Sequence, residues 1–233
     1  MIEHIICQNC HTSNNFANLH CSNCKHLIRE RVINIDLWSS IMGSIDSPSE
    51  MFKQVILAEH KNFILVLFIL ITLRHAISGL LISPYVGIMS IQYYELRLLA
   101  STILTLILYI TLSKVIQQNV IKEITGFKYK DAFALILYGQ TPIIFSLVIL
   151  FLFEIILFGE YLFSIQPSPL EIKPMFFYLF SFLEFAVLIW ALILSSLGFK
   201  QIGISKFTSF LYALVVVVGP IGISLVTLLL FRM

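Results

Sequence analysis

Charged residues are scarce in this chain, and their scarcity excludes an ordinary soluble fold. Of the 233 residues only 12% are Asp, Glu, Lys or Arg, whereas soluble domains average about 25%. Hydrophobic residues account for 58% and the mean hydropathy is +0.93, which is more apolar surface than a soluble fold can bury. The formal net charge is only +2, so we do not expect the strongly basic surface that nucleic-acid binding requires.

Sequence motifs of several functional classes are absent as well. The chain begins with a polar, cysteine-containing segment rather than a basic stretch and a short apolar core, so no cleavable signal peptide is expected. It contains no H-E-x-x-H, G-x-S-x-G or P-loop motif and no paired Asp residues within an apolar stretch. These motifs commonly supply a metal centre or a nucleophile. We therefore expect a protein that is not an enzyme.

Long apolar stretches occur five times, and each is near or above the ~20 residues that cross a bilayer as a helix. Because backbone polar groups in lipid must be satisfied within their own segment, these stretches are expected to be helices. They cover residues 62–82, 98–117, 133–158, 175–197 and 207–231. The sequence therefore predicts an all-α polytopic membrane protein with a five-helix transmembrane bundle in the lipid bilayer.

Lysine and arginine are distributed unevenly between the two ends of the predicted spans. If the N-terminus is cytoplasmic, eleven of them fall on the cytoplasmic side: Lys25, Arg29, Arg31, Lys53, Lys61, Lys114, Lys122, Lys128, Lys130, Lys200 and Lys206. The opposite side holds only Arg97, Lys173 and Arg232. Cytoplasmic loops carry the excess of basic residues. An odd number of spans then makes the C-terminus exocytoplasmic.

All four cysteines lie near the N-terminus, in two C-x-x-C pairs, Cys7 with Cys10 and Cys21 with Cys24. Each pair can turn two sulfurs toward one point, and two such turns form a tetrahedral thiolate cage for Zn²⁺. We expect residues 1–30 to form a zinc ribbon with one structural zinc ion. Two disulfides, or a redox or iron–sulfur role, are the alternatives. A cytoplasmic N-terminus disfavours the disulfides.

The two cysteine pairs also resemble the minimal zinc-ribbon family. In that family glycine often follows the second cysteine of a pair, whereas this chain has His11 and Lys25 there. The resemblance implies a structural zinc ion and often a docking role.

Residues 31–46 form a linker that is apolar in part but too short to span, and they either pack on the ribbon or rest on the membrane. A helix is predicted to follow, because Ser47 can cap it, Pro48 suits its first turn and Glu50 completes a capping box. Its apolar stripe is Met51, Phe52, Val55 and Ile56, extended by Glu59. This pattern is typical of a helix in the membrane interface, and a cytoplasmic extension of the first span is the alternative.

Apart from Lys114, which lies near a cytoplasmic end, the charged or imidazole side chains inside the predicted spans are Arg74, His75, Glu154 and Glu184. Such residues are costly in hydrocarbon and are usually paired or face a cavity. At 1.5 Å per residue, Arg74 lies about 18 Å and Glu184 about 16 Å from the inner face of a core about 30 Å thick. We therefore expect these two side chains to meet. A proton or ion relay and a structural pair are both open.

Helix-breaking residues interrupt two of the predicted spans. Gly139 and Pro142 lie early in the third, and Gly219, Pro220 and Gly222 lie in the fifth. Discontinuous helices line the binding sites of some transporters. Glycine and proline are also common in membrane helices as kinks or points of close packing, which is the alternative.

The membrane domain, residues 47–233, resembles the Yip family. The resemblance is carried by residues 46–52, by 137–142 and by 190–198 with Ser205 and Lys206. It implies five helices, a cytoplasmic N-terminus and an exocytoplasmic C-terminus. Eukaryotic members are linked to vesicle trafficking and Rab binding, and prokaryotic members with a zinc ribbon have no well-defined activity.

We expect a non-enzymatic membrane scaffold or adaptor whose cytoplasmic ribbon docks a protein partner, in membrane organisation or trafficking. The alternative is a small transporter or channel that uses Arg74, Glu154 and Glu184. The two functions differ in whether the protein supports ion flux.

Overall fold

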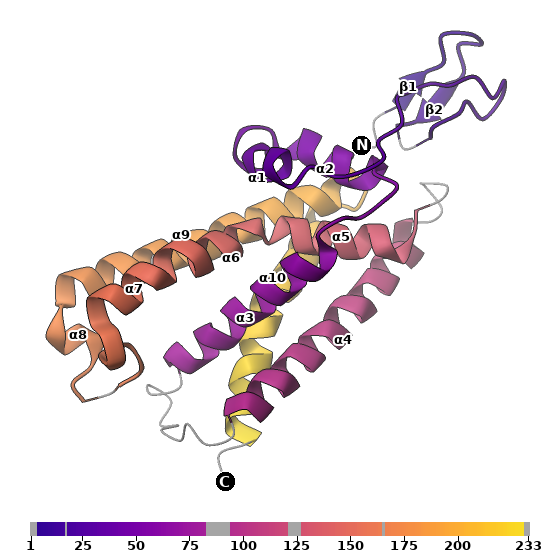
Figure 1. Cartoon of the computed structure of the whole chain (residues 1–233). Coiled ribbons are helices and arrows are strands. Elements are labelled where there is room, and N and C mark those ends of the chain that lie inside the picture. Colours follow the sequence, from indigo (N-terminus) through magenta and orange to yellow (C-terminus); the bar gives the residue numbers. More distant parts are fainter. Residues whose placement is uncertain (1–3, 17, 83–93, 121–126, 165, 231–233) are drawn as a thin grey trace.

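A computed structural model describes residues 4–16, 18–82, 94–120, 127–164 and 166–230. A two-stranded hairpin comes first and helices follow (Figure 1). The elements are β1 (His4–Ile6), β2 (Ser13–Asn15), α1 (Leu37–Asp46), α2 (Pro48–Leu57), α3 (Ile64–Ile82), α4 (Tyr94–Val120), α5 (Tyr129–Gly139), α6 (Thr141–Phe145), the π-helical η2 (Ser146–Leu150), α7 (Phe151–Phe158), the 3-10 helix η3 (Gly159–Phe163), α8 (Pro169–Ile172), α9 (Pro174–Gln201) and α10 (Lys206–Leu230).

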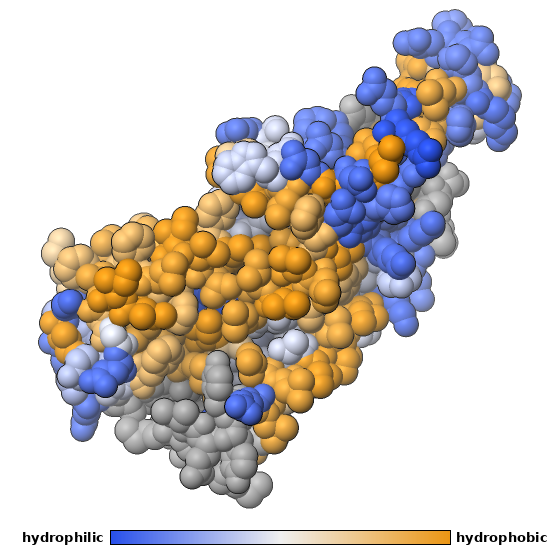
Figure 2. Space-filling view, in the orientation of Figure 1, coloured by the Kyte–Doolittle hydropathy of each residue, from blue (hydrophilic) through white to orange (hydrophobic). Residues whose placement is uncertain are grey.

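Five segments are long and apolar enough to cross a membrane, as predicted. They are Ile64–Ile82, Glu95–Val120, Thr141–Phe163, Pro174–Gln201 and Lys206–Leu230. The side of the bundle seen in Figure 2 is almost wholly hydrophobic, as lipid contact requires. The chain is thus a multi-pass integral membrane protein.

The third span differs from its predicted limits, 133–158. Helix α5 ends at Gly139, and the apolar segment that crosses the membrane begins at Thr141 and continues to Phe163. Pro142 has no backbone N–H, so it starts a new helix rather than continuing the old one. Hydropathy alone merges the two helices, because both are rich in apolar residues.

The helices pack most closely at the end that carries the ribbon. The main buried core joins α2, α5 and the ribbon-side parts of α3, α4, α9 and α10. From that end, α6, α7 and α9 extend in one direction while α3, α4 and α10 extend in another (Figure 1). A small second cluster of Phe158, Leu162 and Phe180 lies near the far end of the first group. The bundle is therefore tight at one end and more open at the other.

Residues 31–46, predicted as a linker, are folded against the bundle. The backbone N–H groups of Glu59 and His60 donate to the carbonyls of Val32 and Ile33, each at 3.0 Å. The Arg31 guanidinium pairs with the Glu59 carboxylate. Helix α1 follows and packs on α2. Backbone and ionic contacts thus connect the base of the ribbon to the start of the membrane domain.

The apolar stripe of α2 contacts protein, so neither sequence-based expectation for this helix is correct. Its four apolar residues are buried, and α2 packs on α5 and α9. A Cβ atom added at Gly198 of α9 would lie 2.8 Å from the Phe52 ring, so glycine is required there for the ring to fit. The helix ends at Leu57, and α3 begins only at Ile64, so α2 is not an extension of the first span.

The N-terminus of α2 is formed as predicted in one respect and not in another. Pro48 occupies its first turn, but Ser47 makes no side-chain cap hydrogen bond. Glu50 pairs with Lys53 at 2.8 Å. The predicted capping box is therefore not formed.

Lys61 fastens the other end of α2 to α5. Its ammonium group donates to the carbonyls of Val55, Ile56 and Ala58, at 2.5, 3.0 and 2.6 Å, and pairs with Asp131 at 3.0 Å. A cation beside the final carbonyls of a helix is favourable. Burial lowers the pKa of Lys61, and the Asp131 carboxylate opposes that shift.

Only the first of the two predicted breaks is found: α5 ends at Gly139, whereas α10 continues through Pro220 from Lys206 to Leu230. At both prolines a hydroxyl group replaces the missing backbone donor. Pro220 cannot donate to the carbonyl of Val216, four residues earlier, and the Tyr109 hydroxyl donates to that carbonyl instead, at 3.2 Å. Pro142 likewise cannot donate to the carbonyl of Tyr138, and this carbonyl accepts from the Thr141 hydroxyl at 3.1 Å instead. Carbonyls freed by proline in a membrane helix need such substitutes because no water is present.

The glycines near the two prolines differ in how closely other helices approach them. A Cβ atom at Gly139 would lie 2.9 Å from the Ser195 Cα atom, and one at Gly219 would lie 2.9 Å from Leu108 Cδ2. Both permit close helix packing, which is the usual role of small residues between membrane helices. A Cβ atom at Gly222 would meet nothing within 4 Å, so packing does not require glycine there.

A buried hydrogen-bond chain links the regions around the two prolines. The Gln140 amide donates to the Tyr109 hydroxyl at 2.7 Å, and the Gln140 carbonyl oxygen lies 3.0 Å from His75 Nε2. Because the amide nitrogen is the donor to tyrosine, the oxygen accepts from histidine. The chain therefore runs from His75 through Gln140 and Tyr109 to the Val216 carbonyl, and it joins the first, second and fifth spans to the residue that precedes the third.

We predict that Tyr109→Phe destabilises the protein in detergent by about 1 kcal/mol, because the Val216 carbonyl then loses its donor. In a Pro220→Ala background the restored backbone N–H supplies a donor, so the same substitution should cost less. Denaturation curves of the four variants measure this coupling. Equal costs of Tyr109→Phe in both backgrounds would show that the hydroxyl does not compensate for proline.

Candidate functional site

The hairpin and the segment after it form two similar cysteine turns. The Cys7 N–H donates to the Thr12 carbonyl at 3.0 Å, and the Cys21 N–H donates to the His26 carbonyl at 2.8 Å. The first turn joins β1 to β2, whose antiparallel register pairs Ile6 with Ser13. Each turn therefore presents its two sulfurs on the same side.

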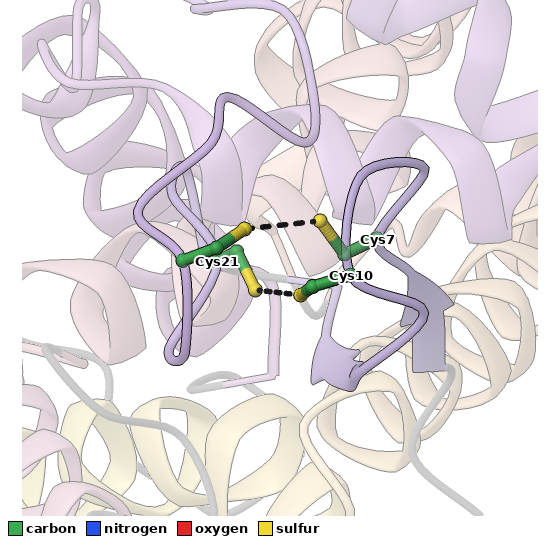
Figure 3. Close-up of side chains that lie close together, drawn as sticks. Cys7, Cys10 and Cys21 are labelled. Atoms are coloured by element: carbon green, nitrogen blue, oxygen red, sulfur yellow. Dashed lines mark hydrogen bonds between the residues drawn. The ribbon is translucent and has the colours of Figure 1, made fainter.

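The four sulfurs converge on one centre. Cys7 and Cys24 Sγ lie 3.6 Å apart, and Cys10 and Cys21 Sγ lie 3.4 Å apart. All four atoms lie within 4.8 Å of one another, and Figure 3 shows the sulfurs of the two turns facing each other. A tetrahedral site with metal–sulfur bonds of about 2.3 Å has sulfurs about 3.8 Å apart. The predicted cysteine cluster is therefore able to hold a metal ion.

His11 and Lys25 have left-handed backbone conformations, with φ angles of 55° and 60°. Each residue donates its N–H to the carbonyl of the first cysteine of its turn, at 2.9 Å to Cys7 and 3.1 Å to Cys21. A residue with a Cβ atom adopts this conformation at a cost of roughly 1–2 kcal/mol, which glycine avoids. These are the two positions at which the zinc-ribbon pattern often has glycine, so the geometry accounts for that preference.

Asn14 connects the hairpin to the second cysteine turn, and sequence reasoning missed it. The buried side chain donates to the Thr12 carbonyl at 2.8 Å and to Cys21 Sγ at 3.5 Å, and its oxygen accepts from the Ser22 N–H at 2.8 Å. Only its position on β2, opposite Ile5, brings it to the metal site. Asn14 therefore orients a ligand without being one.

Hydrogen bonds favour the thiolate form at two of the four cysteines, whereas burial and the neighbouring thiols of Cys24 and Cys10 raise the pKa of Cys7 to about 11. The Thr12 side chain and backbone lower the pKa of Cys10 to about 6. The backbone N–H of Cys24 lowers the pKa of Cys21, and the Asn14 amide contributes to the same shift. Metal ligands must be deprotonated, so both effects support binding.

We predict that Lys25→Gly tightens zinc binding by roughly fivefold, since relief of about 1 kcal/mol of backbone strain adds to the coupled free energy of folding and binding. Lys25→Ala is the matched control, because it removes the charge and keeps the Cβ atom. Affinities follow from competition with a coloured chelator. If alanine tightens binding as much as glycine does, charge rather than backbone strain is responsible.

The predicted contact between Arg74 and Glu184 is confirmed. Arg74 Nη2 and Glu184 Oε2 lie 2.7 Å apart, and their side chains are 3% and 22% exposed. Ser146 bridges them: Arg74 Nε donates to its Oγ at 2.5 Å, and the hydroxyl donates to the Glu184 carboxylate, whose oxygens lie 2.7 and 2.8 Å away. Arg74 Nη1 donates to the Ser78 hydroxyl at 3.1 Å. Each nitrogen of the Arg74 guanidinium group and each oxygen of the Glu184 carboxylate thus has a partner.

Ser146 begins the π-helical turn η2 in the third span. Such a turn inserts an extra residue into a helix, and it occurs often at functional sites. Sequence reasoning missed Ser146, because a serine in an apolar helix gives no distinctive signal.

Glu154 and His75 lie outside this ion pair. Glu154 is only 6% exposed, and its Oε2 atom has no hydrogen-bond partner in the described part of the chain. His75 is buried and bonds Gln140 rather than a carboxylate. Arg74, His75, Glu154 and Glu184 all line one cavity of about 240 Å³ between α3, α7 and α9. The four predicted residues therefore share a site but have different partners.

The helix-break residues do not line this cavity. Its wall comes from α6, η2, α7, η3, α8, the C-terminal half of α3, the N-terminal half of α9 and Ile221 of α10. Ile143 and Ile221 are the members nearest the predicted breaks.

No protein-family model, curated protein or solved structure matches this chain. A function is therefore proposed below from the geometry and chemistry of the chain itself.

We predict that Arg74→Leu and Glu184→Leu each destabilise the protein by about 3 kcal/mol, because each leaves a buried charge without its partner. The double substitution should cost clearly less than the sum. A double-mutant cycle in detergent measures the coupling. The pair Glu50 and Lys53, whose side chains are 64% and 20% exposed, is a control with an expected coupling below about 0.5 kcal/mol. Additive costs at Arg74 and Glu184 would contradict a stabilising contact.

Proposed function

We propose that this protein is a membrane adaptor, in which a cytoplasmic zinc ribbon docks a protein partner onto a five-span bundle. The metal is zinc, because four thiolates in tetrahedral arrangement are a typical zinc donor set. Cys7, Cys10, Cys21 and Cys24 occupy all four positions of such a site. No position remains for water or substrate, so the metal stabilises the ribbon and is not catalytic.

The observation that carries this proposal is that the ribbon, whose four cysteines close one metal site, is exposed. The ribbon projects beyond the end of the bundle (Figure 1), and its surface is largely hydrophilic with a few apolar residues (Figure 2). Two hydrophobic side chains, Ile6 and Leu27, are 64% and 54% exposed on it. Exposed apolar side chains within a polar surface are suited to protein contact.

The distribution of basic residues supports a cytoplasmic N-terminus and an exocytoplasmic C-terminus. The resemblance of residues 47–233 to the Yip family suggests the same orientation. It also suggests a role in membrane organisation or trafficking.

A transporter or channel is the second candidate, favoured by the cavity around Arg74, Glu154 and Glu184. Within the described chain, no residue of α2, α4 or α5 lines that cavity, and the main core fills the ribbon-side end. Arg74 is also neutralised by Glu184. The cavity is therefore better suited to holding a molecule than to conducting one across the membrane.

We predict that a photo-crosslinking residue at position 27 of the full chain yields a discrete adduct in intact cells. Cys21→Ser should abolish both the adduct and the bound zinc, which elemental analysis should find at one ion per wild-type chain. A crosslinker at Tyr161, which is 39% exposed on η3, is the control. An adduct that persists without zinc, or that forms equally from position 161, would contradict docking by the folded ribbon.

A further inference from the structure

The intramembrane cavity contains one acidic group that its neighbours do not satisfy. Glu154 lines the cavity and is 94% buried, since only 6% of its surface is exposed, and its Oε2 atom lacks a hydrogen-bond partner among the described residues. A buried acceptor without a donor is destabilising. This carboxyl group therefore marks a position at which a donor from outside the chain would be favourable.

The charges around the cavity do not cancel. Arg74 is committed to Glu184, Ser146 and Ser78 through Nη2, Nε and Nη1. Glu154 has no ion pair with a described residue within 4 Å. One cation thus faces two carboxyl groups. A buried carboxyl group without a partner keeps its proton, and a ligand with a single positive charge can take the place of that proton.

The cavity is too large for a bare ion and has an apolar wall. Its volume of about 240 Å³ corresponds to roughly eight water molecules at ~30 Å³ each. Phe158, Leu162 and Phe180 also line it, and they offer an apolar surface on which an alkyl chain can be buried. An inorganic cation such as Ca²⁺ would need six or more oxygen ligands, whereas the oxygens of Ser78, Ser146 and Glu184 already bond Arg74 or one another. Its shape and chemistry match a molecule with a charged head and an apolar tail.

The cavity is accessible from outside the bundle. The Glu184 side chain, which lines it, is 22% exposed, and the apolar side of the bundle in Figure 2 shows a small recessed hydrophilic spot. Amphipathic molecules partition into the bilayer, and from there they can enter.

We propose that this cavity binds a protonated primary alkylamine. The ammonium group donates an N–H to Glu154 Oε2, and the alkyl chain packs on Phe158, Leu162 and Phe180. A primary amine satisfies both the charge and the missing donor, whereas a quaternary ammonium supplies only the charge and an alcohol only the donor. The site is independent of the docking function proposed for the ribbon.

The test uses the full chain in lipid nanodiscs at pH 7, with octylamine as the probe and empty nanodiscs as the correction for lipid partitioning. Calorimetry should show saturable binding of one octylamine per chain. Octanol and octyltrimethylammonium should bind about tenfold more weakly or not at all, since each lacks one of the two interactions. Octanoate should not bind.

Glu154→Gln should weaken octylamine binding by about tenfold or more, while Glu160→Gln, at an exposed carboxyl six residues away, should leave it unchanged. If Glu154→Gln fails to fold, Leu162→Trp tests the same site by filling the cavity and keeping the carboxyl group, and it should abolish binding. Undiminished binding to either folded variant would overturn the proposal. Octanol or octyltrimethylammonium binding as tightly as octylamine would overturn it too.

Discussion

The hydrogen bond from the Tyr109 hydroxyl to the Val216 carbonyl shows the constraint on which the bundle depends. In hydrocarbon every backbone carbonyl needs a donor from the protein, and Pro220 removes one from the fifth span. Tyr109 reaches across from the second span to replace it. Its hydroxyl is in turn held by Gln140, which also binds His75. The carbonyl left free by Pro220 is thus the end of a polar chain that connects three spans with the residue preceding a fourth.

The ribbon and the bundle meet the same constraint of polar satisfaction by different means. The ribbon is too small to bury a large core, so four sulfurs around one centre take the place of that core. The bundle has abundant apolar surface, and its difficulty is the small number of polar groups that it buries. Arg74, Ser146 and Glu184 satisfy one another by hydrogen bonds and an ion pair. The Oε2 atom of Glu154 has no partner among the described residues.

Some features could be predicted from sequence because they depend on spacing alone. Two C-x-x-C pairs identify a metal-holding cluster, hydropathy finds five spans, and the rise of a helix places Arg74 and Glu184 at the same depth. Other features depend on which helices are neighbours. The burial of α2 against α9, the bridging role of Ser146 and the support of Cys21 by Asn14 all require that knowledge. The sequence-based limits of the third span wrongly included α5 for a different reason. Hydropathy measures only how apolar the residues are, and it contains no information about the missing backbone N–H of Pro142.

The fit of the Phe52 ring against Gly198 connects α2 to the helix that carries Glu184. Gly198 and Glu184 are 14 residues apart on this helix, or about 21 Å at 1.5 Å per residue, and about four turns separate them, so they lie near the same face. Helix α2 is fixed at one end by the strand-like contact of Val32 and Ile33 with residues 59 and 60. One series of contacts therefore leads from the base of the ribbon through α2 to α9, the helix that also carries Glu184 of the ion pair.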